Sequence, residues 1–165
     1  MKNAAALLLL TIATACRAGG EDVADVAGIR LSPTSDDART HLEEAIGRWE
    51  AAGLARGTLV IAEGGAPVSI KSEVYSYVQN AAGETVWGLV GGVTALVDGR
   101  VKRIEMRADA SLSAWAHELG HAMGLEHGEG LMSRRDLAGG HPIDAHSLAE
   151  LCEIQACDFF QPEQE

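Results

Sequence analysis

The sequence is poor in aromatic residues, in basic residues and in long hydrophobic runs, and each shortage excludes a class of protein. Aromatic residues make up 4% of the 165 positions, and 13 Lys and Arg residues face 24 acidic residues, for a formal net charge of −11. A nucleic-acid-binding protein needs a basic face, so we expect no nucleic-acid partner. The strongly apolar run at residues 4–15 is too short to span a bilayer.

The remaining composition is ordinary for a globular protein. Hydrophobic residues make up 47% of the chain and charged residues 22%, which is enough apolar material for a buried core. The length matches one domain. We therefore expect a single folded domain that is a monomer.

The N-terminus has the layout of an export signal. A short basic start at residues 1–3 precedes an apolar run, and Ala13-Thr14-Ala15 then lead to Cys16. This tetrad resembles a bacterial lipobox, with Ala13 where a larger aliphatic residue is usual. The resemblance implies cleavage after Ala15 and a lipid on Cys16 that anchors the protein to a membrane. Ordinary secretion, with Cys16 as a free thiol, is the alternative.

The chain therefore divides into a signal peptide of the lipoprotein type at residues 1–15, a tether at 16–27 and a folded domain at 28–165. Within the domain, apolar spacing and capping residues predict an α+β fold with a mixed, twisted sheet. Helices are expected over residues 36–52 after a cap at Thr34 or Ser35, from a cap at Asp109 or Ser111 to about Met123, and over residues 144–155. Strands are expected within residues 29–31, 58–62, 68–78, 93–97 and 101–106, and Asp98-Gly99 predicts a hairpin between the last two.

Three histidines are spaced as ligands of one metal ion. Residues 117–127 read His-Glu-Leu-Gly-His-Ala-Met-Gly-Leu-Glu-His. His117 and His121 lie one helical turn apart on one face, and Gly124 lets the chain turn back to bring His127 in as a third nitrogen ligand. Three protein ligands leave the fourth position of a tetrahedral Zn²⁺ for water, as in catalytic zinc sites. The alternative is a helix whose histidines only form a polar surface.

Glu118 follows the first ligand, and a carboxylate there can take a proton from water at the metal. The motif resembles the metzincin signature H-E-x-x-H-x-x-G-x-x-H at every fixed position. The resemblance implies a zincin-like fold, with an N-terminal helix, an active-site helix and a C-terminal helix. It implies a zinc-dependent endopeptidase, acting on peptide or protein substrates, with Glu118 as general base. Met132 would form a hydrophobic floor in a Met-turn, although it follows His127 by only five positions and Ser133 replaces the usual tyrosine.

The resemblance also implies where a substrate would lie. An extended peptide would add to an edge strand, for which residues 93–97 are the candidate. Residues 133–137 would form the wall of the pocket that follows the scissile bond. Either Arg134 or Arg135 would then favour an acidic side chain there, whereas an apolar pocket lined by Leu131 or Leu137 is the alternative.

The other titratable residues have simpler interpretations. His41, His141 and His146 are expected to be solvated or to lie at helix ends, and Asp136 and Asp144 to lie in turns or caps. Cys152 and Cys157 form a candidate disulfide in an exported protein, provided that the helix ends between them. Two separate thiols are the alternative.

Two other functions fit the same metal site. One is a zinc-binding surface lipoprotein with no proteolytic role, and the other is an amidase that acts on cell-wall peptides. The presence of Glu118 argues against the first, since zinc binding needs only the three histidines.

Overall fold

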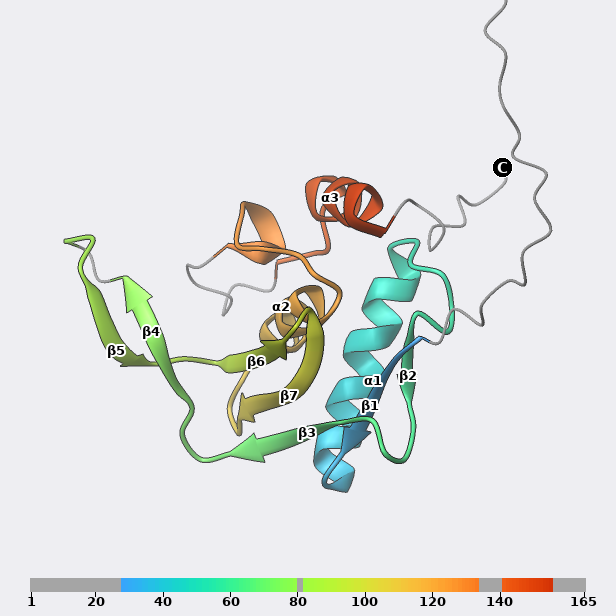
Figure 1. Ribbon diagram of the computed structural model, residues 1–165, viewed down its shortest axis with the longest axis horizontal. Coiled ribbons are helices and arrows are strands. Elements are labelled where there is room, and N and C mark those ends of the chain that lie inside the picture. Colours follow the sequence, from blue (N-terminus) through green and yellow to red (C-terminus); the bar gives the residue numbers. More distant parts are fainter. Residues whose placement is uncertain (1–27, 80–81, 134–140, 156–165) are drawn as a thin grey trace, which may run out of the picture.

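The computed structural model describes residues 28–79, 82–133 and 141–155 (Figure 1). The predicted signal peptide, Cys16, the tether, Cys157 and the side chain of Cys152 lie outside the described part. The elements follow one another as β1 (Ile29–Pro33), α1 (Asp36–Ala51), β2 (Leu59–Ile61), β3 (Ala66–Lys71), β4 (Tyr75–Gln79), β5 (Thr85–Leu89), β6 (Gly92–Val97), β7 (Arg100–Arg107), α2 (Leu112–Ala122), η1 (Gly130–Met132) and α3 (Ala145–Gln155). The α+β class predicted from the sequence is confirmed.

The main sheet is mixed and has β6 at one edge. Its order is β2-β1-β3-β7-β6, in which β6 alone runs antiparallel to its neighbour. Asp98 and Gly99 join β6 to β7 with φ values of 51° and 71°, as in a type I′ hairpin turn. The predicted hairpin and the predicted edge position of residues 93–97 are both confirmed.

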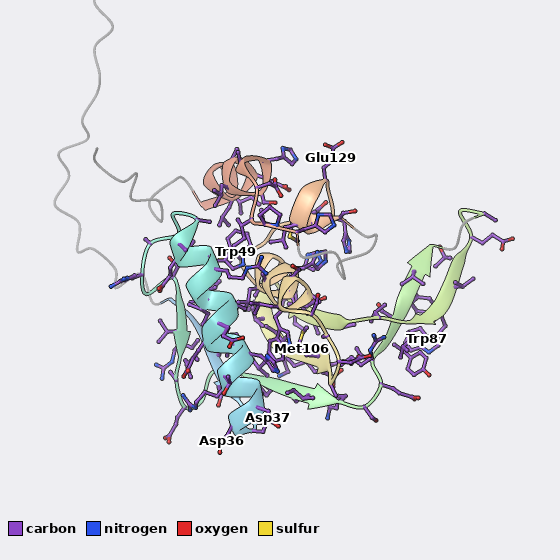
Figure 2. The ribbon with its side chains drawn as sticks, turned by 180° about the vertical axis from the view of Figure 1, so that it is seen from behind. Asp36, Asp37, Trp49, Trp87, Met106 and Glu129 are labelled. Atoms are coloured by element: carbon purple, nitrogen blue, oxygen red, sulfur yellow. The ribbon has the colours of Figure 1, made fainter. Side chains whose placement is uncertain are left out.

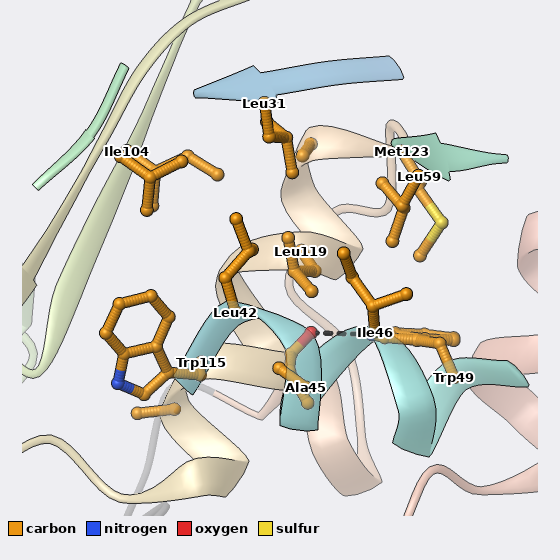
Figure 3. Close-up of a cluster of buried hydrophobic side chains, with 14 of the residues drawn as sticks. Leu31, Leu42, Ala45, Ile46, Trp49, Leu59, Ile104, Trp115, Leu119 and Met123 are labelled. Atoms are coloured by element: carbon orange, nitrogen blue, oxygen red, sulfur yellow. Dashed lines mark hydrogen bonds between the residues drawn. The ribbon is translucent and has the colours of Figure 1, made fainter. Parts of the chain in front are cut away.

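Helices α1 and α2 pack together and form the core with one face of the main sheet (Figure 3). The Oγ of Ser35 caps α1 by accepting from the Ala38 amide at 3.2 Å, and Gly53 ends the helix with φ 114°. Trp49 of α1 is fully buried, and its indole Nε1 donates to the Ala116 carbonyl of α2 at 2.9 Å. This contact holds α2 in a fixed place above the sheet.

Strands β4 and β5 form a separate two-stranded antiparallel sheet. The sequence predicts one extended run over residues 68–78, but the structure divides it into β3 of the main sheet and β4 of this hairpin. Strand β5 was not predicted. Figure 1 shows the hairpin projecting from the end of the main sheet, at the opposite end of the molecule from β2. Within the described part of the chain, no helix is long and apolar enough to cross a bilayer.

Candidate metal centre

Helix α2 sets the spacing of the first two histidines. Ser111 caps its start, with an Oγ that accepts from the Ala114 amide at 3.2 Å, and the chain turns away from the helix axis at Gly124, where φ is 101°. A side chain at that φ would be strained, so glycine allows the chain to leave the helix one turn after His121. The chain then returns past the helix end and carries His127 back toward it.

The structure brings the three predicted ligands together. The Nε2 atom of His121 lies 3.0 Å from the Nε2 of His117 and 3.3 Å from the Nε2 of His127. Two Nε2 atoms on a tetrahedral zinc ion, each at about 2.0–2.1 Å from it, would be about 3.3 Å apart. Among the residues that the structure describes, this is the one group of three or more potential ligands able to hold a metal ion.

Two backbone carbonyls orient the first two rings. The Nδ1 of His117 lies 2.7 Å from the Leu131 carbonyl oxygen, and the Nδ1 of His121 lies 2.7 Å from the Leu125 carbonyl oxygen. A carbonyl only accepts, so in each ring Nδ1 carries the proton and Nε2 offers a lone pair. Two lone pairs facing each other at 3.0 Å repel unless a cation lies between them. The donor set therefore fits a metal ion.

His117 is the most buried of the three ligands, and its surroundings keep it neutral. Burial lowers its pKa to about 4, although the hydrogen bond with Leu131 opposes the shift. Its ring is therefore neutral at neutral pH, with a proton on Nδ1 and none on Nε2. No proton has to be displaced from it when a metal binds.

Glu118 lies beneath the edge strand and is only 6% exposed. The Thr94 hydroxyl of β6 lies 2.8 Å from its Oε2 and 2.9 Å from its carbonyl oxygen. Burial raises the pKa of Glu118 to about 7, against the opposing effect of these hydrogen bonds. The side chain fits only because residue 92 is glycine, since a Cβ there would lie 2.8 Å from the Glu118 Cγ.

Met132 packs under the ligand-bearing turn of α2. It is 1% exposed, and a Cβ at Gly120 would lie 2.5 Å from its sulfur atom. Gly120 stands between the two helical ligands in the sequence. The structure therefore places Met132 against the helix turn that carries His117 and His121. This is the position at which the metzincin resemblance implies a hydrophobic floor beneath the metal.

Comparison with known proteins identifies no family. No protein-family profile matches the chain, and no curated protein matches it. The functional argument for this site therefore depends on its motif and its geometry.

Asp144 supports the site from the start of α3. Its carboxylate accepts hydrogen bonds from the amides of Leu131 and Ser147, both at 2.9 Å, and from the Ser147 hydroxyl at 3.1 Å. Burial acts against ionisation, but these bonds prevail and lower the pKa of Asp144. The sequence indicates only a turn or cap residue at this position. Its link to Leu131, whose carbonyl orients His117, is visible only in the structure.

The remaining predicted residues lie apart from the metal centre or outside the described part. His41 stacks on Trp115, with ring centroids 5.4 Å apart, and neither His141 nor His146 joins the metal-ligand group. Of the predicted pocket wall at residues 133–137, residues 134–137 lie outside the described part. Sequence reasoning missed Thr94 and Gly92, because neither residue type signals a contact with a helix 24 positions away.

Proposed function

We propose that this protein is an exported zinc-dependent endopeptidase of the metzincin type. The observation that carries the proposal is the convergence of three histidine Nε2 atoms beside a buried carboxylate. The two rings held by backbone carbonyls present lone pairs, and Glu118 occupies the next position of the same helix. Metal binding alone requires only the three histidines. It does not explain why the acidic side chain of Glu118 is buried beneath the edge strand, where its carboxylate loses the solvation of water.

The histidines and Glu118 have separate roles in the proposed peptide hydrolysis. A zinc ion bound by the three histidines would lower the pKa of water and polarise the scissile carbonyl. Glu118 accepts the proton of the attacking water and delivers it to the leaving amine. Burial shields this carboxylate from bulk water, and the Thr94 hydroxyl at 2.8 Å from its Oε2 orients it for both steps.

Strand β6 is suited to hold the substrate. The Arg107 amide donates to the Gly91 carbonyl at 2.8 Å, so by alternation the backbone groups of Gly92 and Thr94 point away from β7. No other strand of the described sheet pairs with this edge. An extended peptide can add there as a further strand, directly beside the residue that holds Glu118.

The arrangement of the elements also supports the proposal. An N-terminal helix, strands, a helix that carries two ligands and a C-terminal helix follow one another in the order that the metzincin resemblance implies. The N-terminal sequence supports export, either as a lipoprotein anchored through Cys16 or as a secreted protein.

A digestion panel tests this function against the amidase alternative. The protein is incubated with zinc, an unstructured protein and cell-wall peptides, each with and without a chelator. We expect internal cuts in the unstructured protein that the chelator abolishes. Hydrolysis of the cell-wall peptides alone would support an amidase, and zinc binding without any cleavage would support a binding protein.

A further inference from the structure

The β4–β5 hairpin carries an unusual share of the exposed apolar surface. Of the eight large hydrophobic side chains exposed in the described part of the chain, five lie on this hairpin: Tyr75, Tyr77, Val86, Trp87 and Leu89. Residues 75–89 contain a single charged residue, Glu84, in a chain whose net charge is −11. An exposed apolar patch on a projecting element marks an interaction site.

Three aromatic rings share one face of the hairpin. Tyr77 pairs directly with Trp87 across the strands, with ring centroids 4.9 Å apart, and Tyr75 lies nearly parallel to Trp87 at 6.2 Å. Tyr77 is 72% exposed and Trp87 is 61% exposed. Figure 2 shows Trp87 on the side of the hairpin that is turned away from Glu129 and η1, so this face does not line the metal centre.

The neighbouring outer face of the main sheet carries positive charge. Strand β7 reads RVKRIEMR, four basic residues and one acidic residue, although the whole chain is acidic. Ile104 and Met106 point into the core, so Arg103 and Arg107 point to the opposite face. Arg103 pairs with Glu105 at 3.4 Å and Arg107 pairs with Asp109. The register shift opposite Ala95 and Leu96 interrupts the alternation, and Val101 packs against the core, so the flanking Arg100 and Lys102 also point outward. Lys71 is on the same face, because it pairs in register with Arg107. None of these three cations has a carboxylate partner among the described residues.

We propose that the hairpin and the outer face of β7 form a surface that docks onto an anionic lipid bilayer. Tyrosine and tryptophan place an apolar ring in the acyl boundary and a polar tip at the headgroups, and they are the aromatic residues that gather at membrane interfaces. Basic residues beside them attract anionic headgroups. Strands β4 and β5 carry no charged side chain, so the apolar faces of the rings can enter the interface. The carboxylate of Glu73, which accepts a hydrogen bond from the Tyr75 hydroxyl at 3.3 Å, lies beside the rings.

This orientation is compatible with the proposed chemistry and with the predicted anchor. The metal centre lies on the helical side of the sheet, so a domain resting on its outer face keeps the centre open to the aqueous phase. A lipid on Cys16 would hold the domain within about 40 Å of the bilayer, because residues 17–27 are the only link. The docking surface itself requires neither the lipid nor the peptidase activity.

Trp87 provides a built-in probe for the experiment. The chain has three tryptophans, and Trp49 and Trp115 are 0% and 2% exposed. The full chain is mixed with vesicles of phosphatidylcholine and phosphatidylglycerol, and with matched vesicles whose acyl chains carry bromine, which quenches tryptophan. We expect the emission to shift to shorter wavelengths and the brominated lipids to quench it. High salt should weaken the binding.

Matched variants separate the hairpin from the N-terminal apolar run, which can itself bind vesicles. Tyr77→Ser should reduce quenching of Trp87 at limiting lipid and weaken partitioning about tenfold, the scale expected for losing one large buried apolar side chain. Ile154→Ser, at an exposed apolar residue of α3, is the control and should leave the quenching unchanged. Vesicle binding without quenching of Trp87 would overturn the proposal. A shift of Trp87 emission with glycan fragments but not with vesicles would also overturn it and would indicate a carbohydrate surface.

Discussion

At the scale of single residues, the burial of Glu118 has a measurable energetic consequence. Its pKa rises from the ordinary value of 4.5 to about 7, so in the metal-free protein the folded state holds a proton that the unfolded chain has already lost. The free energy of unfolding therefore falls as the pH rises through this window, and the loss is complete above about pH 7. This change in pKa corresponds to about 3 kcal/mol.

The variant Glu118→Gln cannot ionise and should escape this loss. In the presence of a chelator, we compare the free energy of unfolding of the variant with that of wild type. The difference, variant minus wild type, should be about 3 kcal/mol larger at about pH 8 than at about pH 4. Denaturant titrations at the two pH values measure the difference. Protonation of His117, whose pKa is lowered, destabilises both proteins equally as the pH falls and cancels. A difference that does not depend on pH would show that Glu118 ionises freely in the fold.

Thr94 acts on the same carboxylate as a positioning residue. Its hydroxyl has one proton and two acceptors, Oε2 and the carbonyl oxygen of Glu118. In the proposed peptidase, Thr94→Val should lower kcat by about tenfold to a hundredfold, the scale of a hydrogen bond to a charged group, with little change in KM. Thr94→Ser restores the hydroxyl and should restore kcat. Equal losses in both variants would assign Thr94 a packing role only.

At the scale of elements, α3 contributes to the metal centre through its first turn. Asp144 both caps α3 and holds the Leu131 amide, and the Leu131 carbonyl orients His117. We expect Asp144→Ala to weaken zinc binding about tenfold to a hundredfold, as do other losses of support behind a ligand. Competition with a chromophoric chelator measures this affinity.

A matched control removes a cap without touching the site. Ser35→Ala deletes the N-cap of α1 and should cost about 1 kcal/mol of stability. Its zinc affinity should equal that of wild type. If both variants lost the same affinity, the effect of Asp144 would be a general loss of stability and not local support.

The same elements show how much the sequence could predict. The cap at Ser35, the Asp98-Gly99 hairpin and the end of α2 at Gly124 depend on neighbouring residues, and these local signals appear in the structure as expected. The β4–β5 hairpin was missed because its exposed aromatic face and Gly88 give no core-facing alternation. The contacts of Thr94 and Asp144 were missed because they join residues far apart in the chain, which only the packing of sheet against helix brings together.

At the scale of the whole molecule, a metal ion would join the end of α2 to the segment that follows it. A ligand that binds only the folded state stabilises it, by about 3 kcal/mol at a free concentration of about a hundred times Kd. For a chain of this size, removing zinc with a chelator should lower Tm by about 5–10 °C.

Histidine variants show whether this stabilisation depends on the proposed ligands. His121→Ala should lose the difference in Tm between zinc and chelator. His41→Ala, which alters a histidine outside the metal-ligand group, should retain it. A full difference in the His121 variant would contradict the ligand assignment, and calorimetric scans of both variants supply the comparison.

The most direct test of the central claim is the rate of peptide cleavage per bound zinc ion in wild type and in Glu118→Gln. Zinc is counted by elemental analysis and cleavage is followed on an unstructured protein in the same samples. The account predicts that both proteins hold one zinc ion and that the variant cleaves about 10²–10⁴ times more slowly, because it has lost its general base. Equal cleavage by the two proteins, or no cleavage by zinc-loaded wild type, would contradict it.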